Sequence, residues 1–491
     1  MAQTTRRSYC AFPLLDMDRP SRPWLARAAV AFVVVLLLVP TGVSAVSHER
    51  TGLGPGTVES PANGTTYVAV QGFHFKGVGN AKKPARLVSA DPDAKGAVIT
   101  DGDQEGVSWF YDVDPLENGN LLVTSTTPTS TVVFELDPET DDQVWRERLP
   151  ITDTHDVDKL SEDRLLVANM REYEDGVSND RVFVYDRSND SVVWEYVFRE
   201  HYPNSTDGGF GEDWTHLNDV DEIAPGKYLV SPRNFDQAVV IDRETKTIEY
   251  RLGGDGNHSV LYEQHNPDWL ESEDGNPTML VADSENDRVV EYELRRGADA
   301  ADGVPPERTS TGPSGTWVRT WSVDGFNWPR DADRLPNGNT LVTDTLNHRV
   351  VEITPEGEVV WEFYASWGPY DAERGEKGSN GPTIADIGAE GEYTVSGGAG
   401  RGPAGQVTFS DWLIGVSEGS AFESQLTWFA ERYKHATPFL RPTWMSSWAL
   451  AGVFLATVVV LLWGFGELVY QRARLARAFV RLVDRVRARG V

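Results

Sequence analysis

The sequence predicts an all-β fold, a six-bladed β-propeller flanked by an N-terminal signal or anchor segment and a C-terminal transmembrane helix. Four short β-branched or aromatic runs recur between residues 55 and 441, separated by Asn-Gly and Asp-containing turns. This pattern is typical of antiparallel meanders. A four-stranded sheet cannot bury both faces alone, but sheets packed around an axis bury one another. Two uncharged apolar runs lie outside the repeats.

The repeat is clearest in the copy that begins at Asp331. Its Asp331-Ala332-Asp333 element leads through Asn337-Gly338-Asn339 to Leu341-Val342-Thr343, and the copy ends at Val359-Val360-Trp361. Four other copies have their D-x-D element, or its equivalent, at Asp112, Asp156, Asp219 and Pro267-Asp268. We expect a sixth copy to begin at Pro382, and residues 85–89 to supply the strand that closes the ring. Six blades are therefore predicted, with seven as the alternative.

The N-terminal segment, residues 1–47, is predicted to be a signal peptide or a membrane anchor. The apolar run Ala28 to Pro40 follows Arg27, and the small residues Val43-Ser44-Ala45 offer a cleavage site. Extended to Val46, the run approaches the length that a membrane span requires. Both interpretations stay open, as does a start at Met1 or at Met17.

The second apolar run predicts a transmembrane helix at residues 444–470. Residues Trp448 to Gly466 are uncharged, with tryptophans near both ends. Residues 471–491 form an arginine-rich tail, which the positive-inside rule places in the cytoplasm. The propeller at 55–441 is then extracellular, on a protein held in the cell membrane.

Composition narrows the functional classes. The formal net charge is −30, which argues against nucleic-acid binding because such proteins need a basic face. An acidic surface of this kind is typical of proteins from high-salt environments, so we expect a halophilic, haloarchaeal source. The single cysteine, Cys10, precedes the propeller and leaves it without a thiol nucleophile or disulfide framework.

A column of polar residues is expected at one mouth of the propeller, because each innermost strand begins beside the central channel. The residue before the first Asp of each copy belongs to this column, and His265 joins it when residues 264–268 are aligned on their final Asp. His216 shares a strand face with Asn218. We expect the loop after the second strand of the third blade to return Arg233 and Asn234 to this mouth. The candidates in the column itself are Tyr111, His155, Asn218, His265, Arg330 and, for the sixth copy, Thr383.

Convergent imidazoles and guanidinium groups fit an anionic, oxygen-rich ligand such as sulfate, phosphate or carboxylate. A metal is the other use for three histidines, but an arginine charge opposes a cation and no H-x-H or H-E-x-x-H pair is present. We therefore predict no metal in this column and no cofactor. The repeated Asp residues are expected to cap turns or to bond neighbouring blades.

At these residues the chain resembles the arylsulfotransferase family, periplasmic or surface-exposed enzymes whose sulfate donor is a phenolic ester instead of a nucleotide. The matching motifs are Thr154-His155-Asp156, Asp213 to Asn218, Ser231 to Asn234, Gln264-His265 and Gly381-Pro382-Thr383. The resemblance implies a six-bladed propeller in which a histidine is transiently sulfated. It implies His265 as the nucleophile, with sulfuryl-group ligands at His155, His216, Asn218 and Arg233.

The resulting hypothesis is a sulfotransferase that passes a sulfuryl group from an aryl sulfate to a phenolic or other hydroxyl acceptor. Arg330, Asn234, Thr383 and Tyr111 are candidates to hold the substrate. The alternative is a non-catalytic surface propeller that binds an anionic ligand or partner. A quinoprotein-like oxidoreductase is disfavoured because vicinal cysteines are absent.

Overall fold

The computed structural model describes residues 22–47, 53–58, 60–72, 83–211, 213–297, 300–375, 381–398, 407–442 and 444–488. Cys10, both candidate start sites and the last three residues of the tail lie outside these ranges. The chain divides into two compact units, residues 49–443 and residues 1–48 with 444–491.

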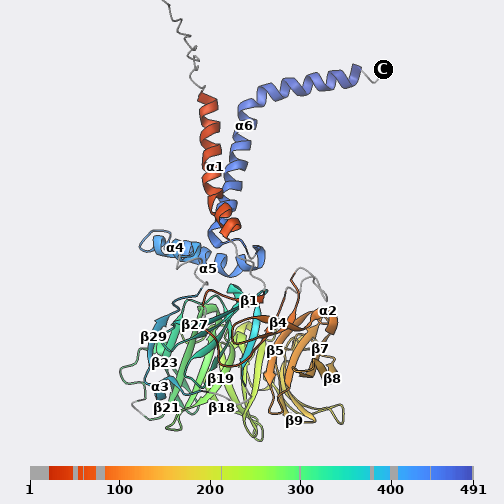
Figure 1. Cartoon of the computed structure of the whole chain (residues 1–491), viewed down its shortest axis with the longest axis vertical. Coiled ribbons are helices and arrows are strands. Elements are labelled where there is room, and N and C mark those ends of the chain that lie inside the picture. The colour runs from red at the N-terminus through yellow and green to blue at the C-terminus, as the bar shows by residue number, and fades with distance from the viewer. Residues whose placement is uncertain are drawn as a thin grey trace, which may run out of the picture. The chain divides into compact units, whose positions relative to one another are not determined.

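The larger unit is a six-bladed β-propeller, as the sequence predicts (Figure 1). Every blade is an antiparallel sheet with four core strands. The closing blade takes its inner strand from late in the chain and its other three strands from early in the chain. One of these early strands, β3, includes most of residues 85–89, which were predicted to close the ring. Its strands are β28 (Pro369–Arg374), β2 (Thr66–Val70), β3 (Arg86–Ala90) and β4 (Gly96–Asp101).

The next three blades run in chain order from the inner strand outward. The first consists of β5 (Trp109–Pro115), β6 (Leu121–Thr127), β7 (Ser130–Asp137) and β8 (Asp142–Leu149). The second consists of β9 (Val157–Ser161), β10 (Arg164–Asn169), β13 (Arg181–Asp186) and β14 (Ser191–Val197), with the hairpin β11 (Tyr173–Glu174) and β12 (Val177–Ser178). The third consists of β15 (Leu217–Ala224), β16 (Lys227–Pro232), β17 (Gln237–Asp242) and β18 (Thr247–Gly253).

The last two blades carry additional edge strands. One consists of β19 (His265–Glu271), β20 (Pro277–Asp283), β21 (Arg288–Arg295) and β23 (Gly315–Asp324), joined by β22 (Thr309–Gly312) and β29 (Gly391–Thr394). The other consists of β24 (Pro329–Arg334), β25 (Thr340–Asp344), β26 (Arg349–Ile353) and β27 (Val359–Ala365), joined by β1 (Leu53–Pro55).

The core lies between the blades. Six clusters of buried hydrophobic residues each draw side chains from two neighbouring blades, so the hydrophobic core runs around the whole ring. Trp361, which ends a repeat, is 1% exposed in one of these clusters. Burial of such sheet faces is the main stabilising contribution.

The inner-strand aspartates bond neighbouring blades, as expected. Asp156 accepts a hydrogen bond from the Val220 amide at 2.6 Å, and Asp331 accepts one from the Ala372 amide at 3.1 Å. Asp371 repeats the arrangement with the Val113 amide at 3.0 Å. These contacts connect inner strands that share no backbone ladder.

The predicted start of the sixth copy is wrong. Its inner strand is β28, at Pro369, whereas Pro382 precedes the short helix α3 (Ile384–Ile387). Thr383 caps this helix by accepting a hydrogen bond from the Asp386 amide. Two further helices of this unit are α4 (Phe409–Ser417) and α5 (Glu423–Leu440). Both lie within residues 55–441, the range predicted to form the propeller. A short helix, α2 (Gly102–Glu105), follows β4.

The smaller unit consists of helices α1 (Arg22–Ser47) and α6 (Ser447–Ala488). Both are long and apolar enough to cross a membrane, over residues 23–46 and 447–482. They pack together: Arg27 donates to Glu467 at 2.8 Å, and Ser44 contacts Ser446 at 2.9 Å. A Cβ on Gly452 would lie 2.1 Å from the Leu37 carbonyl oxygen, so only glycine permits this approach. Residues 471–488 of the predicted tail are helical and form the last part of α6.

Candidate active site

The column predicted from the repeats lies at the beginning of the inner strands. In five of the six blades a register shift places one extra residue at this point. Such a β-bulge redirects a side chain that would otherwise follow the strand's alternation. The column consists of Tyr111, His155, Asn218, His265, Arg330 and Tyr370, all buried.

Tyr370 takes the position that the sequence analysis assigned to Thr383. Thr383 is buried elsewhere, beside the opposite end of β24: the amide of the next residue donates to Glu291, which also pairs with Arg334. Thr383 is therefore not part of the column.

The three predicted histidines gather around two tyrosines. The His155 ring lies 3.9 Å from the Tyr111 ring and 5.3 Å from the His216 ring, measured between centroids. The Tyr370 ring lies 5.3 Å from His155 and 5.9 Å from His265. The chain thus brings residues from five blades into one polar, aromatic cluster.

The hydrogen bonds of Ser284 determine which nitrogen of His265 carries the proton. Ser284 Oγ lies 2.6 Å from the Pro329 carbonyl oxygen, which can only accept, so the hydroxyl hydrogen is used there. His265 Nδ1 lies 2.8 Å from the same Oγ and must therefore donate to it. A neutral imidazole with its proton on Nδ1 presents a lone pair at Nε2.

The charge state of His265 agrees with this assignment. Burial, followed by the charges of Arg330 and Arg233, holds the pKa of His265 well below its ordinary value. The ring is 1% exposed and neutral at neutral pH. Its Nε2 consequently presents a lone pair without prior deprotonation, which is what a nucleophilic imidazole requires.

His216 is oriented by Asp213. Its Nδ1 lies 2.8 Å from a carboxylate oxygen of Asp213, and Arg171 binds both oxygens of that carboxylate at 2.8 and 2.9 Å. Burial alone would raise the pKa of Asp213, but hydrogen bonds from His216 and Arg171 lower it. The ionised carboxylate only accepts, so His216 donates from Nδ1. Burial and the charge of Arg233 lower the pKa of His216 to about 3, so the ring is neutral at neutral pH and has a lone pair on Nε2.

His155 forms a second hydrogen-bonded pair. Its Nδ1 lies 2.7 Å from the Tyr370 hydroxyl, and its Nε2 faces Asp153 at 3.8 Å. Asp153 also accepts from the Tyr111 hydroxyl at 2.5 Å. Burial lowers the pKa of His155 to about 4. This ring is therefore neutral as well, and its tautomer is directed by Tyr370 and Asp153.

Arg330 is a buried guanidinium without a carboxylate partner among the residues that the structure describes. One Nη donates to Gln71 at 2.8 Å, while Nε has no hydrogen-bond partner. The group lies over the Tyr370 and Trp328 rings, 4.4 and 4.9 Å from their centroids. A buried cation in this state has a strong preference for an anion.

Arg233 and the two asparagines complete the site. Arg233 pairs with Glu263 at 3.1 Å, and its Nε donates to Asn234. Asn234 in turn donates to the Asp213 carbonyl at 2.6 Å, so it connects Arg233 with the loop that orients His216. Asn218 donates to the Gln264 carbonyl, and its buried Oδ1 has no partner within the described ranges.

Helix α5 lies at one end of the propeller (Figure 1), and its His435 approaches the surroundings of His265 through Trp328. Trp328 is the link, with its ring perpendicular to His265 at 6.4 Å and stacked on His435 of α5 at 6.2 Å. The Trp328 amide and His435 both donate to Asp287. Burial alone would lower the pKa of His435, but Asp287 and Glu285 raise it to about 9. The mouth therefore carries a charged imidazolium at neutral pH.

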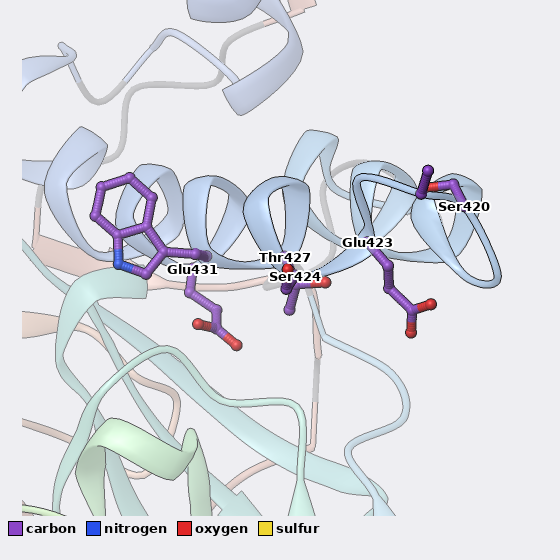
Figure 2. A pocket seen from close by; sticks show the side chains of 7 residues that line it. Ser420, Glu423, Ser424, Thr427 and Glu431 are labelled. Carbon is purple, nitrogen blue, oxygen red and sulfur yellow. The ribbon is translucent and has the colours of Figure 1, made fainter.

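A shallow pocket along α5 and the turn before it is a separate feature (Figure 2). It is lined by Ser420, Ala421, Glu423, Ser424, Thr427, Trp428 and Glu431. None of the column residues belongs to it. Its two carboxylates and absence of basic residues make it unsuited to the anion that the column fits.

Several residues of this site were not identified from the sequence. Tyr370 was missed because its copy reads Asp371-Ala372-Glu373 instead of D-x-D, although Tyr370-Asp371 repeats the pair Tyr111-Asp112. Ser284, Asp153 and Arg171 come from connections that the repeat does not describe. Asp213 begins the motif Asp213 to Asn218 but was not identified as a site residue. Its position three residues before His216 was the one indication in the sequence that the two side chains could meet.

Comparison with known proteins gives one informative match. The family model of the arylsulfotransferases (ASST) matches residues 87–366, more than half of the chain. None of the curated proteins matches the chain.

Among solved structures, a protein of unknown function from Bacteroides caccae is similar with 13% identity and a TM-score of 0.41, over 63% of this chain and 98% of that one. Virginiamycin B lyase from Staphylococcus aureus has 11% identity and a TM-score of 0.31, over 52% of this chain and 69% of that one. A chain of a nidogen/laminin complex has 9% identity and a TM-score of 0.40, over 63% and 97%. Likenesses this distant carry no functional argument.

Proposed function

Because the chain belongs to the arylsulfotransferase family, we propose that it transfers a sulfuryl group from an aryl sulfate ester to a phenolic or other hydroxyl acceptor through a sulfated His265. The observation that carries the mechanism is the hydrogen bond from His265 Nδ1 to Ser284. It leaves the lone pair of Nε2 for attack on sulfur.

In the first step, Nε2 of His265 forms a bond to sulfur while the bond from sulfur to the aryl oxygen breaks. The electron pair of that bond leaves with the phenolate. Arg330, with an unpaired Nε, and Arg233 supply cationic donors for the sulfuryl oxygens and the departing charge. His155 and the free Oδ1 of Asn218 are the other polar groups of the proposed binding site.

In the second step, the acceptor hydroxyl attacks sulfur and the nitrogen–sulfur bond breaks. His216 Nε2 takes the hydroxyl proton, and the Asp213 carboxylate stabilises the resulting imidazolium. His216 then releases the proton to water, which restores the starting state. The two half-reactions predict ping-pong kinetics.

The decisive experiment is peptide mass analysis after incubation with 4-nitrophenyl sulfate at the salt concentration that keeps the protein folded. We expect one added sulfuryl group on the peptide that contains His265, and its loss on adding phenol. His265→Ala should release no nitrophenol. His258, whose side chain is half exposed and stacks on Tyr262, offers the matched control, and His258→Ala should behave like the wild type. Equal turnover by both variants would disprove the proposal.

A second function is favoured by one observation, the buried guanidinium of Arg330, to which the described residues offer no carboxylate and whose Nε they leave without a hydrogen bond. It fits a sulfate or carboxylate whether or not chemistry follows. A propeller that only binds would show saturable binding of an aryl sulfate, abolished in Arg330→Met, with neither phenol release nor a sulfated peptide.

We also propose that α1 stays attached and forms a membrane anchor with α6. The Arg27–Glu467 pair and the close approach at Gly452 support a permanent helix pair instead of a cleaved leader. The arginine-rich end of α6 would then face the cytoplasm and the propeller the outside. The net charge of −30 supports a halophilic source.

A further inference from the structure

A ring of carboxylates lies in the propeller channel directly beyond the column. In nearly every blade, the first and the third residue after the column member are acidic, as Asp112 and Asp114 are after Tyr111. The ring consists of Asp112, Asp114, Asp156, Asp158, Asp219, Asp221, Asp268, Asp331, Asp333, Asp371 and Glu373. Some of these groups accept backbone amides of the next blade, but each such bond uses one oxygen only.

The ring carries more negative charge than its surroundings compensate. Asp112, Asp219 and Asp333 each have one buried carboxylate oxygen, Oδ2, to which no residue described in the structure donates a hydrogen bond. Buried carboxylates without a cationic partner are costly unless they are protonated or bind a metal.

Three of the carboxylates are spaced for one cation. Asp112, Asp114 and Asp156 each offer an oxygen, and these oxygens all lie within 4.8 Å of one another. Oxygens bound to one Ca²⁺ at about 2.3–2.6 Å can lie up to about 5 Å apart, so a single ion can contact all three. Asp112 and Asp156 come from adjacent blades and are 6% and 7% exposed.

Asp219, from the following blade, provides an independent indication. It is 5% exposed, and its Oδ2 has no hydrogen-bond partner in the part of the chain that the structure describes. Asp112, one of the three clustered residues, likewise has a buried Oδ2 without a partner in that part of the chain. An orphaned, buried carboxylate oxygen within such a cluster is the arrangement of an incomplete coordination sphere.

We propose that this ring binds one Ca²⁺ through Asp112, Asp114 and Asp156, with Asp219 as a further ligand. All donors are oxygens and most are charged, which favours a hard divalent cation over zinc or copper. An ion at this place would join three blades at the axis. It would also neutralise the ring that lies beneath the anion site.

The test uses the full chain in detergent, stripped with EDTA, exchanged into metal-free buffer and titrated with CaCl₂ by calorimetry. We expect one Ca²⁺ per chain, with Mg²⁺ binding at least about tenfold more weakly. Asp114→Asn should weaken Ca²⁺ binding by about 10- to 100-fold. Asp333→Asn is the matched control, since it removes a buried channel carboxylate from the opposite side of the ring, and it should leave binding within about threefold of wild type.

A thermal melt with and without Ca²⁺ provides the second readout. Ca²⁺ should raise the melting temperature of wild type and Asp333→Asn, and have little effect on Asp114→Asn. If Asp114→Asn does not fold, Asp112→Asn replaces it. Failure of the stripped wild-type protein to bind Ca²⁺ stoichiometrically at millimolar concentration, or equal losses in both variants, would overturn the proposal.

Discussion

Ser284→Ala tests whether one hydroxyl controls the tautomer of the proposed nucleophile. Ser284 accepts from His265 and donates to the Pro329 carbonyl, and it is fully buried. Removing the hydroxyl leaves both partners without their hydrogen bond. The imidazole is then free to carry its proton on Nε2, the nitrogen that must attack sulfur.

The size of the effect follows from the charge that develops on the ring. A neutral hydrogen bond contributes about 0.5–1.5 kcal/mol, and one to a charged group about 1.5–3 kcal/mol. His265 becomes an imidazolium as sulfur binds, so the bond to Ser284 strengthens by about 1–1.5 kcal/mol in the transition state. We expect kcat/KM to fall roughly 5- to 13-fold. The fall is larger if a substantial fraction of His265 carries its proton on Nε2 instead of Nδ1.

The assay is nitrophenol release from 4-nitrophenyl sulfate, with the melting temperature recorded in parallel. The two orphaned partners should also destabilise the fold by about 1–3 kcal/mol. Ser322→Ala is the matched control, because it removes a buried hydroxyl from the outer strand β23. If Ser284→Ala keeps its kcat/KM within twofold of the control, the hydroxyl does not direct the tautomer and the reasoning fails.

Three other predictions follow from the same contacts. Arg330→Met should lower kcat/KM by about 100-fold without lowering the melting temperature, because it removes a buried charge for which the described residues offer no carboxylate; a loss of several degrees would contradict this. The pKa values of His155 and His216 are lowered to about 4 and about 3, so kcat/KM should stay flat from about pH 8 to about pH 5. These histidines also contribute stability that is present above about pH 6.5 and is lost as the pH falls towards their folded-state pKa values. A fall in kcat/KM on the acid side with a midpoint near pH 6.5 would contradict this prediction. Ser44→Cys with Ser446→Cys, in a Cys10→Ser background, should form a disulfide in the mature protein, and absence of residues 1–45 from its intact mass would refute the helix pair.

The repeat made most of the column predictable. Its D-x-D element recurs at a fixed distance from the turn of each blade, so aligning the copies places His155, Asn218 and Arg330 at equivalent positions. The structure adds the reason why these residues face the axis, which is the bulge at the start of most inner strands. Sequence alternation alone would have directed the column residue and its neighbouring Asp to opposite faces.

The partners of the column could not be predicted, because they come from segments that do not repeat. Ser284 begins a 3-10 turn after β20, and Asp213 adopts a left-handed backbone conformation in the loop before β15. Helix α5 was missed for a related reason: residues 423–440 were included in the propeller although they contain no copy of the repeat. Each depends on tertiary contacts that a local pattern does not encode.

In the proposed reaction, the charges of the site would serve both substrate binding and nucleophilicity. Arg330 and Arg233 would attract the sulfate ester, and the same positive potential, added to burial, lowers the pKa of His265 and keeps the ring unprotonated. When sulfur binds to Nε2, the substrate's negative oxygens offset both guanidinium charges, which favours the imidazolium that the apo site disfavours. The free His265 is therefore a ready nucleophile, whereas its sulfated form is stabilised only while the anionic group is in place. An acceptor that removes this group returns the ring to its neutral state, so the electrostatics of the site favour turnover over accumulation of a dead-end cation.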